Sequence, residues 1–207
     1  GFFYPQNQLS REIWNFVAPI MQQMLSFIEE KTQPLQNWGF EVYRGVTTGY
    51  NRAFVLTTER KNEILEEDSS SKEIIHPILK GKDVSPFTHT WRDFWLIFTK
   101  HGVEIEKYPG VYNFLLQYKK DLTPKPQNWQ PSQQRYKKWP GRKSGNYNWY
   151  EIQDVTRYSK YMEYPKILVQ ELSKGPPFCL DLQGFWALAK VNVIVPRQTS
   201  LYPLLKS

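Results

Sequence analysis

The chain has 207 residues, of which 40% are hydrophobic, 16% aromatic and 23% charged, and its formal net charge is +7. This composition is typical of a globular domain with a core of its own and excludes a disordered chain, while the absence of an apolar run near the ~18 residues of a membrane span excludes a membrane partner. Because Cys179 is the single cysteine, no internal disulfide can form, and we expect a soluble protein of the reducing cytoplasm.

The first segment, residues 9–32, has apolar residues at spacings of three or four and therefore predicts a helical segment. Pro19 lies inside this pattern and predicts a kink or a meeting of two helices. The sequence starts at Gly1 rather than Met, and we interpret it as a piece of a longer chain. We expect residues 1–34 to be a helical segment or linker and residues 35–207 to be a separate domain.

Two glycines four residues apart, Gly45 and Gly49, divide a predicted strand at residues 38–44 from a short buried strand at residues 53–56. Glycines can adopt positive φ, so this loop predicts a tight turn that presents N–H groups and short polar side chains. Such a loop suits close approach to a phosphate or a base edge. The alternative is an ordinary connection between two strands.

The middle of the chain predicts two short helices at residues 59–67 and 70–79, followed by a turn at residues 80–83 that carries Lys80 and Lys82. Residues 94–99 are too apolar for a surface strand, and we expect them to run through the centre of a sheet. Pro109 fits the first position of a helix that ends near Leu122.

Residues 123–148 have no periodic pattern, which indicates a long loop. The window 119–143 holds eight basic residues and one acid, so it carries a charge equal to that of the whole chain. Aromatic residues and prolines are interleaved with these bases, and bases beside aromatics can pair with phosphates while stacking on nucleotides. The alternative is a solvated loop without a partner.

Strands are predicted again at residues 149–153, 166–172, 178–182 and 191–195. Helices thus gather early in the chain and strands late. This order predicts an α+β domain built on a twisted mixed β-sheet with peripheral helices, preceded by the N-terminal helical segment.

Enzymatic motifs are missing from the sequence. Residues 175–178 read Gly-Pro-Pro-Phe, which has a glycine where an adenine methyltransferase needs a hydrogen-bonding side chain. His76, His89 and His101 have no zinc-ligand spacing. We therefore predict no catalytic, metal-binding or cofactor-binding residue, and the fragment is not expected to be catalytic by itself.

Several landmarks resemble, in order, those of the TaqI-like C-terminal specificity domain, the target recognition part of adenine-specific DNA methyltransferases and of single-chain restriction enzymes that also methylate. The glycine loop at residues 45–55, GVTTGYNRAFV, is similar to the family's G-[IV]-x-T-G-x-N-x-A-F-[IV]. Further matching segments are IIHPILKGKDV at 74–84, FWLIFT at 94–99, WYEIQ at 149–153 and PKIL at 165–168.

The resemblance implies sequence-specific recognition of double-stranded DNA by residues 35–207. It also implies an upstream methyltransferase domain of the same protein that binds S-adenosylmethionine and flips the target adenine, and, as in the family's single-chain restriction enzymes, restriction endonuclease activity in the parent protein. The alternative is a protein-protein interaction module that binds an acidic partner or subunit, and a third hypothesis is an RNA-binding module.

The candidate DNA-binding residues fall into two groups. We expect one group to read base edges, because arginine pairs well with guanine and asparagine with adenine: Arg44, Thr48, Asn51, Arg52, Arg135, Arg142 and Asn146. We expect the other group to hold phosphates: Lys80, Lys82, Lys125, Lys137, Lys138 and Lys143.

Overall fold

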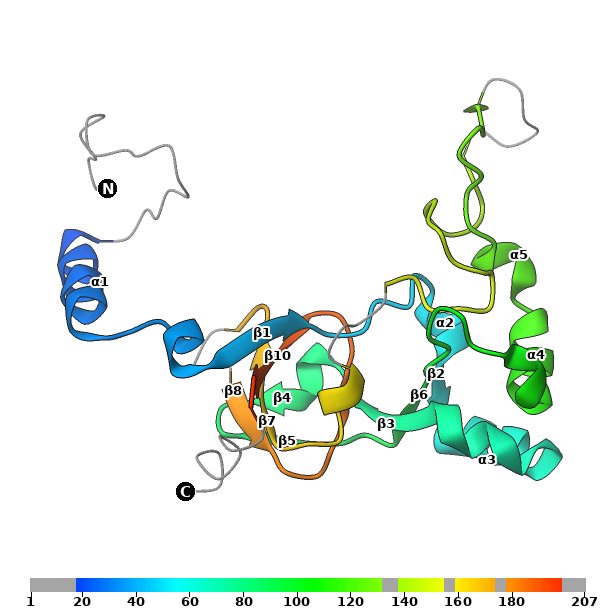
Figure 1. Cartoon of the computed structure of the whole chain (residues 1–207), viewed down its shortest axis with the longest axis horizontal. Coiled ribbons are helices and arrows are strands. Elements are labelled where there is room, and N and C mark those ends of the chain that lie inside the picture. The colour runs from blue at the N-terminus through cyan, green and yellow to red at the C-terminus, as the bar shows by residue number, and fades with distance from the viewer. Residues whose placement is uncertain (1–17, 132–137, 155–158, 174–177, 199–207) are drawn as a thin grey trace. The chain divides into compact units, whose positions relative to one another are not determined.

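A computed structural model describes residues 18–131, 138–154, 159–173 and 178–198 (Figure 1). The chain divides into two compact units, residues 1–40 and residues 41–207. The predicted role of the first unit as a link to an upstream catalytic domain stays a prediction.

The first unit contains one described α-helix, α1 (Pro19–Lys31), and a short 3₁₀ helix, η2 (Leu35–Trp38). Pro19 begins α1 instead of kinking it, because proline lacks the N–H that a first helical residue leaves unbonded. The earlier half of the predicted segment lies outside the described residues. The apolar side chains of α1, including Ile20, Met24 and Phe27, are exposed.

The second unit contains a four-stranded sheet with the order β1-β10-β7-β8. β10 pairs antiparallel with β7, and β7 pairs antiparallel with β8. Along β8 the exposed Phe178 and Leu180 alternate with the buried Cys179 and Asp181, as expected for a sheet with one buried face. The strands are β1 (Phe40–Arg44), β7 (Lys166–Gln170), β8 (Phe178–Asp181) and β10 (Val191–Pro196).

A second four-stranded sheet has the order β2-β6-β3-β9 and is mixed, because β3 and β9 run parallel while the other pairs are antiparallel. β6 lies inside this sheet and its Leu96 and Ile97 are fully buried, which confirms the prediction for residues 94–99. The strands are β2 (Val55–Thr57), β3 (Ile75–Leu79), β6 (Phe94–Ile97) and β9 (Trp186–Ala187), with a separate hairpin of β4 (Val84–Ser85) and β5 (Thr88–His89).

Helices α2 to α5 gather near β2 and β6 (Figure 1). The helix predicted at Pro109 begins there, although it is interrupted before α5. The helices are α2 (Asn51–Phe54), α3 (Thr58–Glu67), α4 (Pro109–Leu116) and α5 (Lys119–Leu122), and the 3₁₀ helices are η3 (Ser69–Ile74), η4 (Gly81–Asp83), η5 (Ile105–Lys107) and η7 (Ser159–Tyr161).

The α+β class is confirmed, but the strands form two four-stranded sheets rather than one. Residues 75–79 were expected to be helical and instead form β3, because Pro77 disfavours a helix interior and the strand pairs with β6. Residues 53–56 begin as the helical turn α2 before β2. Residues 149–153 form no strand, since their carbonyls bond to a buried arginine described below.

Candidate nucleic-acid interface

The glycine loop is packed against the chain segment between β9 and β10. Val46 donates its N–H to the Ala187 carbonyl (2.7 Å), and Ala189 donates back to Val46 (2.8 Å). A Cβ on Gly45 would lie 2.3 Å from the Leu188 carbonyl oxygen, so only glycine fits there. Gly49 has φ +76°, a conformation that favours glycine. Both glycines therefore fix the path of the loop toward α2.

Thr48 is 1% exposed, so its side chain is not presented at the surface for the base reading that the sequence predicts. Its Oγ1 accepts the N–H of Tyr50 (3.2 Å) and donates to Oδ1 of Asn51 (2.7 Å). A short hydroxyl side chain that bonds to nearby backbone and side-chain groups is typical of a turn before a helix. Thr48 therefore orients the Asn51 side chain.

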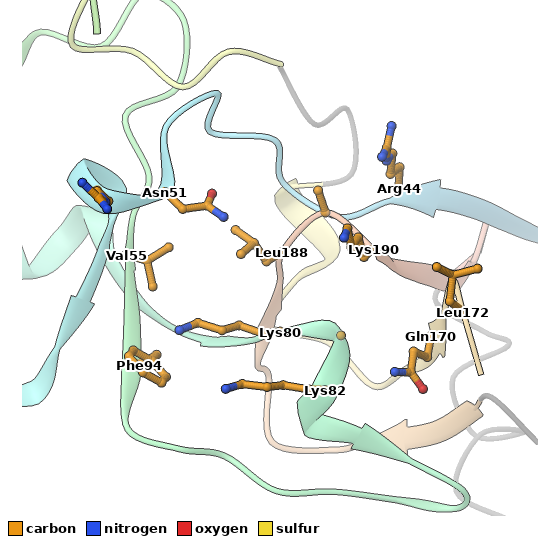
Figure 2. A pocket seen from close by; sticks show the side chains of 13 residues that line it. Arg44, Asn51, Val55, Lys80, Lys82, Phe94, Gln170, Leu172, Leu188 and Lys190 are labelled. Atoms are coloured by element: carbon orange, nitrogen blue, oxygen red, sulfur yellow. The ribbon is translucent and has the colours of Figure 1, made fainter. Parts of the chain in front are cut away.

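A concavity of about 610 Å³ opens beside the loop (Figure 2), and we call it the basic concavity. It brings together five predicted residues that are far apart in the sequence: Arg44, Asn51, Arg52, Lys80 and Lys82. The other lining residues are Val55, Gly81, Phe94, Gln170, Leu172, Leu188, Ala189 and Lys190. These described lining residues include five bases and no acid, so the concavity suits an anion.

The floor of the basic concavity holds Lys80 against an aromatic ring. The Lys80 ammonium nitrogen lies 3.0 Å from the centroid of Phe94, a cation–π contact. Burial lowers the pKa of Lys80 below its ordinary value, partly opposed by the nearby carboxylate of Asp83. Asp83 itself accepts the backbone N–H of Lys80 (2.8 Å) and lies 3.1 Å from Nε of Arg92. The turn that presents Lys80 and Lys82 is thus held from behind by a buried carboxylate.

Arg44 lies at the rim, where its Nη2 is 4.0 Å from the Glu171 carboxylate and its side chain is 63% exposed. A pair this exposed contributes little stability. The Glu171 pair alone therefore does little to hold the Arg44 side chain in place.

A second concavity of about 460 Å³ lies at the base of the long loop, and we call it the loop concavity. Its described lining residues are Lys125, Trp129, Lys138, Trp139, Gly141, Arg142, Lys143 and Ser144. They again include no acid. Trp129 and Trp139 pack edge to face with their centroids 6.1 Å apart, and the Trp139 indole donates to the Thr123 carbonyl (3.1 Å). Cations and fixed indoles therefore share one surface.

Arg142 is 4% exposed, so its guanidinium is not presented at the surface for the base reading that the sequence predicts. Its five N–H groups all have partners, because Nε donates to one carbonyl and each terminal nitrogen donates to two, namely those of Leu122, Thr48, Glu151, Asn148 and Trp149 at 2.7–3.2 Å. Burial lowers its pKa to about 10, so it stays charged at neutral pH. Arg142 is an internal anchor that joins the glycine loop to the long loop.

The remaining predicted residues are placed differently. Arg135 and Lys137 lie outside the described residues. Asn146 is exposed on the long loop but lines neither concavity. No contact with DNA is tested for any predicted residue, so these roles stay predictions.

The sequence interpretation missed Lys190, Gln170 and Phe94, which complete the basic concavity. Lys190 has φ +82° in the turn before β10. Its position as a basic residue in a turn between two predicted strands could have identified it as a candidate. Gln170 and Phe94 belong to strands, where sequence alone does not show which face a side chain occupies.

Other kinds of site have little support within the described ranges. No cluster of three or more histidine, cysteine or acidic side chains is placed to bind a metal ion among residues 18–131, 138–154, 159–173 and 178–198. Nor does any helix in that described part combine the length and apolarity needed to cross a bilayer.

No protein-family model matches the chain, and no curated protein matches its sequence. Among solved structures, the chain is similar to the Type IIL restriction-modification enzyme MmeI in complex with DNA, with a TM-score of 0.50 and 15% sequence identity. The match covers 81% of this chain and 20% of that chain, so this chain spans about a fifth of the length of that enzyme. The fold is therefore one that occurs within a restriction-modification enzyme.

Proposed function

We propose that this chain is the target recognition part of a larger restriction-modification enzyme and binds double-stranded DNA. The observation that carries this proposal is the basic concavity, whose described lining has five cations and no acid. Duplex DNA carries a negative charge per ~1.7 Å of its axis, so a surface of this kind gains affinity by releasing counterions. The fold likeness to a restriction-modification enzyme supports the same function.

The residues of the two concavities have two proposed roles, phosphate contact and base reading. Lys80, Lys82 and the lysines of the loop concavity hold phosphates, which set the register of the duplex. Asn51 and Arg52 at the start of α2 face base edges, because their α-helical turn is fixed by the glycine loop. We also propose that the resemblance to the TaqI-like specificity domain extends to an upstream adenine methyltransferase.

S-adenosylmethionine would belong to that upstream domain. Its sulfonium is a cation, which the five bases of the basic concavity would repel. The basic concavity thus does not favour the sulfonium of the cofactor, and we assign none of its residues a step in methyl transfer.

A salt titration of duplex DNA binding tests the proposal. We expect affinity, followed by fluorescence anisotropy, to fall steeply with salt, with a log-log slope near −0.9 for each phosphate contact. Lys82→Ala should weaken binding to all sequences and make the slope shallower by about one contact, whereas Arg52→Ala should weaken binding and relax the preference at one base position. Lys72→Ala is the matched control, because Lys72 is exposed on η3 and lines neither concavity.

Two results would count against the proposal. An absence of duplex binding at low salt would favour the acidic protein partner instead. Stronger binding to single-stranded RNA than to duplex DNA would favour the RNA-binding alternative.

A further inference from the structure

Asn51 has its carbonyl oxygen engaged inside the protein. The N–H of Tyr50 occupies a lone pair of Thr48 Oγ1 at 3.2 Å, which leaves the Thr48 hydroxyl proton for Oδ1 of Asn51 at 2.7 Å. Because Thr48 is 1% exposed, the hydroxyl end of this bond is buried, while Asn51 itself is exposed. The Asn51 amide is therefore oriented before any ligand arrives, with its NH₂ group available to the basic concavity (Figure 2).

The neighbouring polar side chains also donate. Arginine and lysine are donors without an acceptor, so Arg52, Lys80 and Lys82 add only N–H groups to those of Asn51. The one other lining side chain with an acceptor, Gln170, lies apart from Asn51 across the concavity in Figure 2. The end of the concavity at Asn51 thus favours a ligand edge made of acceptors.

Base edges differ in this respect. In the major groove guanine presents two acceptors, O6 and N7, and thymine presents only one, O4, beside a methyl group. Adenine presents the N7 acceptor beside an N6 donor, and cytosine presents a donor. An asparagine that reads adenine must accept from N6 with its carbonyl oxygen, and at Asn51 one of the two lone pairs of that oxygen already accepts from Thr48.

We infer that the basic concavity takes the acceptor edge of a guanine, with Asn51 donating to it, in preference to adenine. This inference rests on the proposed DNA binding. It replaces the sequence-based expectation that Asn51 pairs with adenine. A phosphate is the other acceptor group that fits, and it would give no dependence on base identity.

The experiment selects duplexes from a random library with the wild-type chain, with Asn51→Asp and with the control Asn113→Asp. An aspartate at position 51 can still accept from Thr48 but has lost the NH₂ donors. Asn113 is exposed on α4 and lines neither concavity, so its substitution makes the same chemical change elsewhere.

We expect the wild type and Asn113→Asp to select the same sites with at least one guanine position. In Asn51→Asp the preference for guanine at that position should fall about tenfold, while the other positions keep theirs. Ranking sequences within each variant removes the general loss of affinity caused by the added negative charge.

A second measurement needs no variant. Replacing the selected guanine by 7-deazaguanine should weaken binding of the wild-type chain about tenfold, because one acceptor is lost. Three outcomes would overturn the inference and leave the proposed function standing. They are a guanine preference that persists in Asn51→Asp, an adenine preference of the wild type that Asn51→Asp loses, and an unchanged affinity for 7-deazaguanine. Absence of any selection or duplex binding would instead refute the proposed function, and the inference with it.

Discussion

At Arg142 the surroundings of the side chain, more than its residue type, decide whether it has a structural role or is exposed to a ligand. Its guanidinium lies against the rings of Phe54 and Tyr147 and bonds to carbonyls of several segments. Leaving a buried cation of this kind without partners costs free energy of folding. Leaving its buried carbonyl partners without a donor costs free energy as well.

Replacing Arg142 by alanine should therefore lower the free energy of unfolding by about 3–5 kcal/mol, as measured by urea denaturation. Lys143→Ala, one residue away and exposed, should change stability by less than about 0.5 kcal/mol. Equal effects of the two substitutions would contradict the anchoring role.

His76 is a second residue whose environment decides its behaviour. Its ring stacks on Trp186 with centroids 4.3 Å apart, and burial lowers its pKa from 6.5 to about 4. The unfolded chain thus binds more protons than the folded chain between these two pH values. Stability supplied by neutral His76 is present above pH 6.5 and is lost as the pH falls toward 4.

Lowering the pH from 7 to 5 should accordingly cost the wild type about 2 kcal/mol of unfolding free energy through His76. His76→Phe keeps an aromatic ring and removes the titration, so its loss over the same pH range should be smaller by that amount. Urea denaturation of both chains at pH 7 and pH 5 measures this difference. An equal loss of unfolding free energy in the wild type and in His76→Phe would disprove the effect.

At the scale of elements, β7 and β8 are joined by a buried ion pair. Lys166 and Asp181 face each other across the two strands with Nζ and Oδ2 2.6 Å apart, and both side chains are 0% exposed. Asp181 also accepts the N–H groups of Gln183 and Phe185 (both 2.9 Å), so it fixes the turn that follows β8.

Lys166→Met should destabilise the protein by about 3–5 kcal/mol, because it leaves the Asp181 carboxylate buried without its cation. The double variant Lys166→Met, Asp181→Leu should cost less than the sum of the two single changes, since no unpaired charge remains. Denaturation of the single and double variants measures this coupling, and strictly additive losses would show that the pair is not coupled.

The elements that the sequence predicted well have strong local signals. The α3 helix, the proline at the start of α4, and β6 with its apolar run follow from capping, proline chemistry and burial. β3 was misassigned because its pairing with β6 is a long-range contact that overrides the local pattern.

The candidate site was predictable to a similar extent. Residue type and loop context identified Asn51, Arg52, Lys80 and Lys82, which the structure brings to one concavity. The burial of Thr48 and Arg142 was not predictable, because polar and basic residues are usually exposed and the carbonyls that receive them come from distant parts of the chain.

At the scale of the whole molecule, a bonded path connects the two concavities. Arg142, which lines the loop concavity, donates to the Thr48 carbonyl (2.9 Å), and the Thr48 side chain bonds to Asn51 in the basic concavity. The two surfaces are therefore joined by one network of hydrogen bonds, and a further prediction of the proposed function is that one duplex engages both.

Lys82→Ala and Lys138→Ala remove one exposed cation from each concavity. If one duplex contacts both, each variant should reduce the salt slope of binding by about 0.9 and the double variant by about 1.8. A double variant whose slope equals that of Lys82→Ala would show that the loop concavity does not contact the duplex.

The carbonyl partners of Arg142 have a consequence for how this molecule can diversify. All five bonds go to main-chain oxygens, which every amino acid supplies whatever its side chain. Exposed positions around the anchor can therefore exchange one amino acid for another without loosening the framework that holds them. A family of chains that shares such an anchor could acquire new binding preferences by substitution of exposed residues alone, at little risk to folding.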